Sequence, residues 1–211
     1  MDLYSQLAEK VESGDMASVK SLVNKALSEK APVDEILNKG LVAGMESIGK
    51  KFKENIVFVP EVLVAARAMK AGLELIKPLL ASTGAKRANK IVIGTVKGDL
   101  HDIGKNIVGF MLEGAGYEVV DLGIDVSKEK FMDAARKEDA RIIGLSALLT
   151  TTMIYMKEIV ASVKESDLKD KVRVIIGGAP VTQSFADDIK ADGYAADAPS
   201  AVDIVKSLLA V

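Results

Sequence analysis

The chain has 211 residues, of which 49 % are hydrophobic and 27 % are charged, and its formal net charge is −2. These totals predict one large or two small domains with real hydrophobic cores, and the balanced charge without a basic run argues against a nucleic-acid partner. The lack of cysteine excludes disulfides, thiolate metal sites and a cysteine nucleophile. The sequence shows no signal-like N-terminus and no apolar run of roughly 20 residues, so we expect a soluble, cytoplasmic protein without a membrane partner.

Residues 1–82 are predicted to form helices only, in an antiparallel four-helix bundle that makes a separate domain. Apolar side chains recur at helical spacing in four successive segments. Ser13-Gly14-Asp15 separates the first two helices, and Pro32 and Pro60 are well placed to begin the third and the fourth. The apolar positions are Leu3, Leu7 and Val11, then Val19, Leu22, Val23 and Ala26, then Leu37, Leu41, Met45, Ile48 and Phe52, then Val62, Ala66, Met69, Leu73, Ile76 and Leu80.

Residues 83–89 are small and polar, which predicts an interdomain linker, and residues 90–211 are predicted to form an α/β domain. Strands are expected at 90–95, 118–122, 141–146, 172–176 and 193–195, and helices at 104–115, 127–138, 151–165, 182–190 and 199–209. This alternation with short loops predicts a doubly wound, flavodoxin-like (Rossmann-type) sheet of five parallel strands.

The loop after the first predicted strand contains His101, the only histidine of the chain. A lone loop histidine is most often a solvated or capping side chain. Here, however, Asp99 and Asp102 flank it, and a metal-bound or catalytic imidazole usually has its second nitrogen oriented by a carboxylate. One histidine cannot build a zinc site, so a metal bound through His101 is expected to arrive with its other ligands attached. Nearby glycines, including Gly104, do not match the dinucleotide or phosphate-binding patterns.

The loops after the other strands should meet His101, because the carboxyl ends of parallel strands share one edge. Ser146, Thr150 and Thr152 follow the third predicted strand, where their hydroxyls could also serve only as helix caps. Gly177-Gly178 follows the fourth strand, and the small-residue segment that contains Tyr194 belongs to the fifth. Small residues on several adjacent loops favour a deep slot over a shallow catalytic patch.

Three motifs of the chain resemble, in order and with matching gaps, the cobalamin-binding signature D-x-H-x-x-G…S-x-L…G-G. They are Asp99-Leu-His-Asp-Ile-Gly104, Ser146-Ala-Leu148 and Gly177-Gly178. The segment from Phe52 to Lys70 is similar to the helical cap that precedes this domain in methionine synthase and in the corrinoid proteins of methyltransferase systems. The resemblance covers essentially the whole chain and matches the stand-alone corrinoid methyl carriers in length and layout.

This resemblance implies a cobalamin or related cobamide, in its methyl form a methylcobamide, whose cobalt takes His101 as its lower axial ligand. Asp99 would accept a hydrogen bond from the other ring nitrogen, and Thr152 would complete this relay. Phe52 and Val59 would shield the methyl group on the opposite face of the cobalt. The implied cofactor-binding residues are Asp99, His101, Asp102, Ile103, Gly104, Ser146, Leu148, Thr150, Gly177, Gly178, Tyr194, Phe52 and Val59.

The implied function is that of a methyl carrier without a complete active site of its own. A substrate-specific methyl-donor:corrinoid methyltransferase would load it, an acceptor methyltransferase would unload it, and a reductive activase would be a third partner. Three alternatives stay open at this point. The cobalamin subunit of an adenosylcobamide-dependent mutase usually lacks this cap, a cobalamin-binding regulatory module normally adds a DNA-binding domain, and a cofactor-free receiver-like domain should show an acidic cluster after its first strand.

Overall fold

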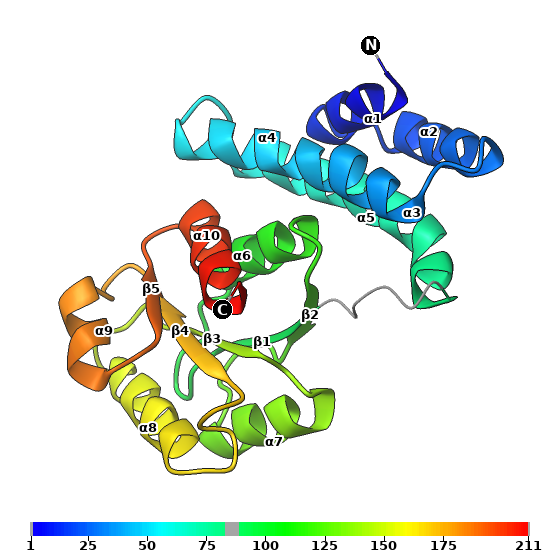
Figure 1. Cartoon of the computed structure of the whole chain (residues 1–211). Helices are drawn as coiled ribbons and strands as arrows, with labels where there is room; N and C mark the ends of the chain where they lie inside the picture. The colour runs from blue at the N-terminus through cyan, green and yellow to red at the C-terminus, as the bar shows by residue number, and fades with distance from the viewer. Residues whose placement is uncertain (1, 83–88, 211) are drawn as a thin grey trace. The chain divides into compact units, whose positions relative to one another are not determined.

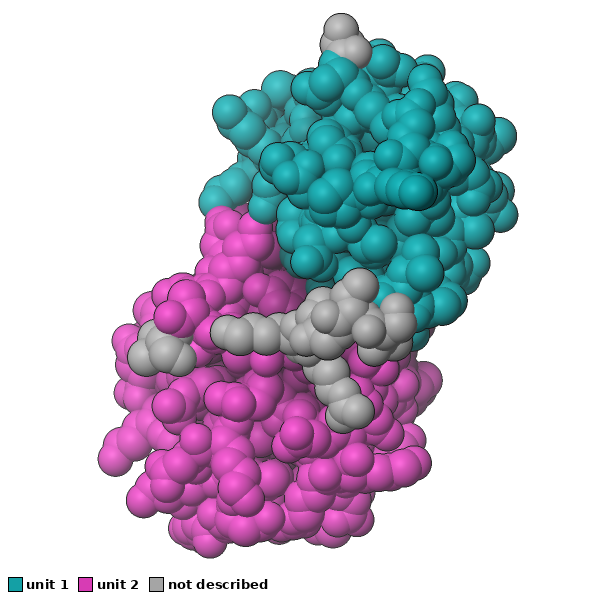
Figure 2. Space-filling view, turned by 45° about the vertical axis from the view of Figure 1, so that its right-hand side comes forward, with its two compact units in different colours: residues 1–88, 110–116 teal, residues 89–109, 117–211 magenta. Residues whose placement is uncertain are grey.

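The structure is a computed structural model that describes residues 2–82 and 89–210. It divides into two compact units (Figure 2): one contains residues up to 82 together with 110–116, and the other contains residues 89–109 and those from 117 onward. Of the predicted linker at 83–89, all but Asn89 lies outside the described residues. None of the helices in the described ranges is long and apolar enough to cross a membrane.

The first unit is the predicted bundle of helices (Figure 1). In chain order its elements are α1 (Leu3–Glu12), α2 (Met16–Ser28), α3 (Val33–Glu35), η1 (Ile36–Val42), α4 (Ala43–Lys53) and α5 (Val59–Ser82). Asp2 and Asp15 cap the first two helices by accepting hydrogen bonds from the backbone N–H groups of Ser5 (2.7 Å) and Ser18 (3.0 Å). The third predicted helix is the continuous run from α3 to α4, but its middle, η1, is a π-helix that apolar spacing does not predict.

The second unit is a five-stranded, all-parallel sheet in the order β2-β1-β3-β4-β5, as the flavodoxin-like prediction requires. Its elements are β1 (Lys90–Thr95), the part of α6 (Ile103–Gly114) up to residue 109, β2 (Glu118–Asp121), α7 (Lys128–Glu138), β3 (Ile142–Ser146), α8 (Met153–Lys164), β4 (Arg173–Gly177), α9 (Gln183–Ile189), β5 (Gly193–Ala195) and α10 (Ala198–Leu209). Helices α7, α8 and α9 lie on one face of the sheet, and α6 and α10 lie on the other (Figure 1).

The register of the sheet brings three strand ends level with one another. Thr95 of β1 pairs with Ser146 of β3, and Ser146 pairs with Gly177 of β4. The loops that follow these strands therefore begin side by side at the carboxyl edge. The strand order reverses direction between β1 and β3, and in such sheets this switch point is where ligands bind.

Two glycines at this edge have opposite surroundings. Gly178 has a φ of +132°, and a Cβ atom there would lie 1.9 Å from the carbonyl oxygen of Ala147. The loop after β4 thus packs directly on the loop after β3, and only glycine permits this approach. A Cβ atom at Gly104 would meet nothing within 4 Å. Gly178 therefore serves the packing of the protein itself, whereas Gly104 faces open space.

We expect Gly178→Ala to lower the free energy of unfolding by about 2 kcal/mol or more, because the new methyl group meets backbone at a φ that L-residues rarely adopt. Gly104→Ala is the matched control, and its free energy of unfolding should stay within about 1 kcal/mol of the wild type. Urea unfolding of the ligand-free protein measures both. Equal stability of the two variants would contradict this description of the edge.

Candidate functional site

The imidazole of His101 is held by one carboxylate oxygen. Its Nδ1 atom lies 2.8 Å from Oδ1 of Asp99, and the same oxygen accepts the backbone N–H of His101 at 3.1 Å. The Asp99 side chain is fully buried, whereas the His101 side chain is 51 % exposed. The carboxylate is therefore fixed inside the protein while the ring that it orients faces outward.

The second oxygen of Asp99 binds the loop after β3. Oδ2 accepts the backbone N–H groups of Leu148 (2.8 Å) and Leu149 (3.1 Å). The hydroxyl of Thr152 lies 2.8 Å from this oxygen and 2.8 Å from the carbonyl oxygen of Leu149, so its single proton is placed between two acceptors. One carboxylate thus joins the loops of two adjacent strands, and it brings together the predicted relay of Asp99, His101 and Thr152.

The charge of Asp99 follows from these contacts. Burial alone would raise the pKa of the Asp99 carboxyl, but the hydrogen bonds from His101, from the Leu148 N–H and from Thr152 outweigh it and hold the pKa well below its usual value. An ionised carboxylate only accepts hydrogen bonds, so Nδ1 of His101 must carry the proton. The lone pair then lies on Nε2, which is the ring atom that can bind a metal.

Other bonds hold the backbone of this loop. The hydroxyl of Thr95 donates to the carbonyl oxygen of His101 (2.9 Å). On the other side, Oδ1 of Asp125 accepts the backbone N–H of Gly98 (2.7 Å), and the Asp125 N–H donates to the carbonyl oxygen of Asp99 (3.1 Å). The segment that carries the imidazole is therefore fastened both to the end of β1 and to the loop after β2.

Large apolar side chains lie exposed on both loops that Asp99 joins. Leu100 and Ile103 on the first loop are 66 % and 75 % exposed, and Leu148 and Leu149 on the second are 43 % and 41 % exposed. Gly104 adds open space beside them. Exposed apolar groups on neighbouring loops mark a binding surface, and the half-exposed side chain of His101 lies on one of these loops. The edge suits a ligand with a broad apolar body and a site for one nitrogen donor.

The remaining predicted residues of this unit lie along the same edge, with different surroundings. Asp102 is half-buried and accepts a hydrogen bond from the Asn106 side chain at 3.0 Å. Ser146 ends β3 beside Gly177, and Thr150 is exposed in the loop that follows. Tyr194 in β5 is half-buried and packs against the hydrophobic core. Their contacts with a ligand stay a prediction.

The predicted cap residues belong to the first unit. Phe52 lies near the end of α4 and Val59 begins α5, and both are half-buried. Between them, Ile56 and Phe58 are 61 % and 62 % exposed. The apolar tip of this unit is therefore formed mainly by two side chains that the sequence reasoning did not single out, and the roles of Phe52 and Val59 stay a prediction.

Sequence reasoning also missed Lys105, a buried lysine in the first turn of α6. Ile103, Ile107, Val108 and Met111 recur at helical spacing in the sequence and would predict one buried face. In the structure Met111 is buried and Ile103 is exposed, and the buried side of the helix also includes Lys105, Gly109 and Leu112. Lys105, Gly109 and Leu112 lie in line along the helix. These three share i, i+4, i+7 spacing, which is the signal that could have identified the lysine as buried.

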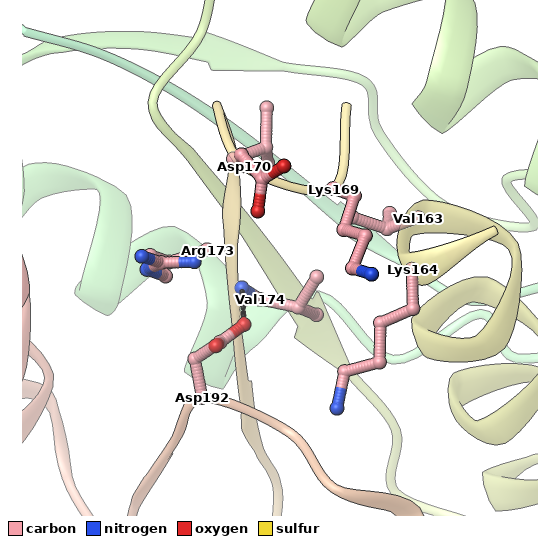
Figure 3. Close-up of a pocket in the computed structure, with 8 residues that line it drawn as sticks. Val163, Lys164, Lys169, Asp170, Arg173, Val174 and Asp192 are labelled. Carbon is pink, nitrogen blue, oxygen red and sulfur yellow. Dashed lines mark hydrogen bonds between the residues drawn. The ribbon is translucent and has the colours of Figure 1, made fainter. Parts of the chain in front are cut away.

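A pocket of about 400 Å³ lies at the opposite edge of the sheet, where β4 begins (Figure 3). Lys164 and Lys169 lie on one side of the strand and Arg173 on the other. Two of its polar side chains have partners within the protein: Oδ2 of Asp192 accepts the Val174 N–H at 2.7 Å, and Lys164 donates to a backbone carbonyl. This pocket is remote from His101, and its size does not make it the functional site.

Comparison with known proteins agrees with the geometry. Residues 89–203 match the family model of a B12 binding domain, and residues 3–77 match a second family model with the same description. The dimethylamine corrinoid protein of Methanosarcina barkeri is 46 % identical over 211 residues, covering 99 % of this chain and 98 % of that protein.

Two solved structures have the same fold along the whole chain. A cobalamin-binding protein from Desulfitobacterium hafniense DCB-2 is 32 % identical with a TM-score of 0.80, and 98 % of each chain is covered. A chain of the methanol:cobalamin methyltransferase complex of Methanosarcina barkeri is 31 % identical with a TM-score of 0.85, covering 99 % of this chain and 80 % of that one. With both units matched, the chain belongs to the corrinoid proteins, the family built on the B12-binding domain.

Proposed function

We propose that this protein binds a corrinoid through Nε2 of His101 and carries a methyl group on the cobalt from one methyltransferase to a second. The observation that carries this proposal is the geometry of His101. A buried carboxylate fixes the tautomer and the direction of a half-exposed imidazole, and the two loops that this carboxylate joins carry exposed apolar side chains. This is how proteins hold a histidine that must ligate a metal.

The donor set fits a corrinoid better than a bare metal ion. Within residues 2–82 and 89–210, no three histidine, cysteine or acidic side chains are grouped to hold an ion. A corrin ring brings its own equatorial nitrogen donors, so the protein has to supply a single axial ligand, and the chain contains a single histidine. The exposed side chains of Leu100, Ile103 and Leu148 suit the apolar face of such a ring.

A bound corrinoid supplies the cobalt chemistry, and the residues of this chain control the ligand. Asp99 makes the imidazole a stronger donor by accepting a hydrogen bond from its Nδ1–H group, and Thr152 with the Leu148 N–H holds the carboxylate in place. We assign contacts with the cofactor tail to Ser146, Gly177 and the neighbouring loop residues.

The partners follow from the relatives. One related protein is named for dimethylamine and one solved relative is part of a methanol methyltransferase complex, so this architecture serves more than one methyl donor. We therefore assign the choice of donor to the methyltransferase that loads the protein. Because a cobalt centre that cycles its charge is open to oxidation, we add a reductive activase as a third partner. Phe52 and Val59 would cover the upper face of the cofactor.

His101→Ala removes the only imidazole and should weaken binding of methylcobalamin at least about tenfold, because the cofactor loses its axial ligand from the protein. Equilibrium dialysis measures the affinity, and the visible spectrum of the desalted complex reports the axial ligand. The variant should remain folded by circular dichroism, since the ring is half exposed.

A wild-type protein that is folded but retains no colour after desalting would contradict the proposed function. An identical spectrum for the wild type and the His101→Ala variant would remove His101 as the ligand while leaving corrinoid binding intact.

Asp99→Asn should lower the free energy of unfolding of the ligand-free protein by about 2–4 kcal/mol. Both carboxylate oxygens of Asp99 accept hydrogen bonds, but an amide has an NH₂ group in place of one oxygen, and this NH₂ group would point at hydrogen-bond donors of the protein. Asp125→Asn is the matched control. Asp125 accepts one backbone N–H through Oδ1, which an amide oxygen can also accept, so the loss should stay below about 1 kcal/mol. Urea unfolding separates the two, and equal losses would contradict the central place of Asp99.

A further inference from the structure

The buried polar and charged side chains of the described residues are Thr95, Asp99, Thr152 and Lys105. Three of them have direct roles at the His101 loop: Thr95 bonds its backbone, Asp99 bonds its ring, and Thr152 bonds Asp99. Lys105 is the fourth, and neither the B12-binding signature nor the relay accounts for it.

Lys105 is the centre of a second network beside the loop. Its Nζ atom donates to Oδ2 of Asp121 (2.5 Å) and to Oδ1 of Asn106 (2.6 Å). The Asn106 amide in turn donates to Oδ2 of Asp102 (3.0 Å). Asp102 is the residue directly after His101, and its carbonyl oxygen accepts the Asn106 N–H at 2.8 Å, which begins α6. The network therefore ends next to the metal-ligating residue.

The network also connects two elements of the fold. Lys105 lies in the first turn of α6, and Asp121 is the last residue of β2, paired with Ile93 of β1. The other oxygen of Asp121 accepts the Gly123 N–H at 2.9 Å, which fixes the direction of the carboxylate. Lys105 thus connects the beginning of α6 to the carboxyl end of β2, whereas the Asp99 side chain bonds the loop after β3.

This ion pair adds little net stability, because desolvation of the buried Lys105 ammonium offsets its attraction to the partly exposed carboxylate of Asp121. The Lys105 side chain is only 3 % exposed, so an apolar residue of similar length would fill the same space without that penalty. Unlike an apolar side chain, Lys105 makes directional hydrogen bonds. They bind Asp121 at the end of β2 and Asn106, whose amide in turn holds Asp102.

We propose that Lys105 is a positioning residue for the cobalt ligand, acting through Asp121, Asn106 and Asp102 to hold the start of α6 and the loop that carries His101. This inference rests on the proposed function, since the imidazole has to meet a metal for its position to matter. Asp99 fixes the ring, and Lys105 fixes the backbone that follows it.

The test is Lys105→Met, which keeps the aliphatic length and leaves Asp121, 43 % exposed, to solvent. The protein is saturated with methylcobalamin, and the visible spectrum gives the fraction of cofactor ligated by imidazole. We expect the ligation equilibrium to weaken about tenfold, as for residues that orient a metal ligand from outside its coordination shell. In the ligand-free variant, the amides of residues 102–106 should exchange faster with deuterium.

Asn106→Ala is a second variant that cuts the link to Asp102 and leaves the pair of Lys105 and Asp121 intact; it should shift the ligation equilibrium in the same direction. Lys90→Met is the control. Lys90 pairs with Glu138 at 2.9 Å at the amino end of the sheet, so its loss can change the melting temperature but should leave the spectrum unchanged.

A wild-type ligation equilibrium in both Lys105→Met and Asn106→Ala would overturn the inference, as would an equal spectral change in Lys90→Met. These outcomes are separate from failure of the proposed function, in which the wild-type protein itself would show no imidazole-ligated cofactor.

Discussion

The candidate site depends on one buried anion. The Asp99 carboxylate accepts hydrogen bonds from the ring and backbone of His101, from two backbone amides of the loop after β3, and from Thr152. No water is needed to satisfy it, and its charge is stabilised by donors that are all fixed by the fold. Removing the charge would release the imidazole and also separate two loops.

The parallel sheet makes this convergence possible. Because β1 and β3 are neighbours and their last residues are paired, a side chain on the β1 loop can reach the amides of the β3 loop. The strand order reverses at the same place, so no crossover helix covers the edge there. The fold thus holds the half-exposed imidazole of His101 at this edge, on a loop that also carries the exposed side chain of Leu100.

Much of this arrangement could be predicted from the sequence because its signals are local. The alternation of short apolar strands with helices predicts the parallel sheet. Asp99, His101 and Thr152 follow the ends of two strands, and the topology of such a sheet makes these two strands neighbours. The resemblance to the cobalamin-binding signature assigned the same residues. Their roles toward the cofactor, and those of Phe52 and Val59, remain predictions that binding experiments have to test.

Other parts could not be predicted because their partners are distant or carry no sequence signal. The backbone amides that hold Asp99 belong to Leu148 and Leu149, and a backbone donor looks the same in every residue. The spacing of Lys105 with Gly109 and Leu112 could indicate that it is buried, but its partner Asp121 lies 16 residues further along the chain and only the fold brings the two together. Gly178 was expected to give space to a ligand, whereas the structure also uses it for contact with Ala147.

The most direct test of the account is electron paramagnetic resonance of the protein loaded with cobalt(II) corrinoid, with the histidine either unlabelled or labelled with ¹⁵N. The chain has a single histidine, so the label marks one residue. If Nε2 of His101 is the axial ligand, each cobalt line is split in three by ¹⁴N and in two by ¹⁵N. Splitting that does not change with the label would show that another nitrogen is bound, and it would contradict the central claim.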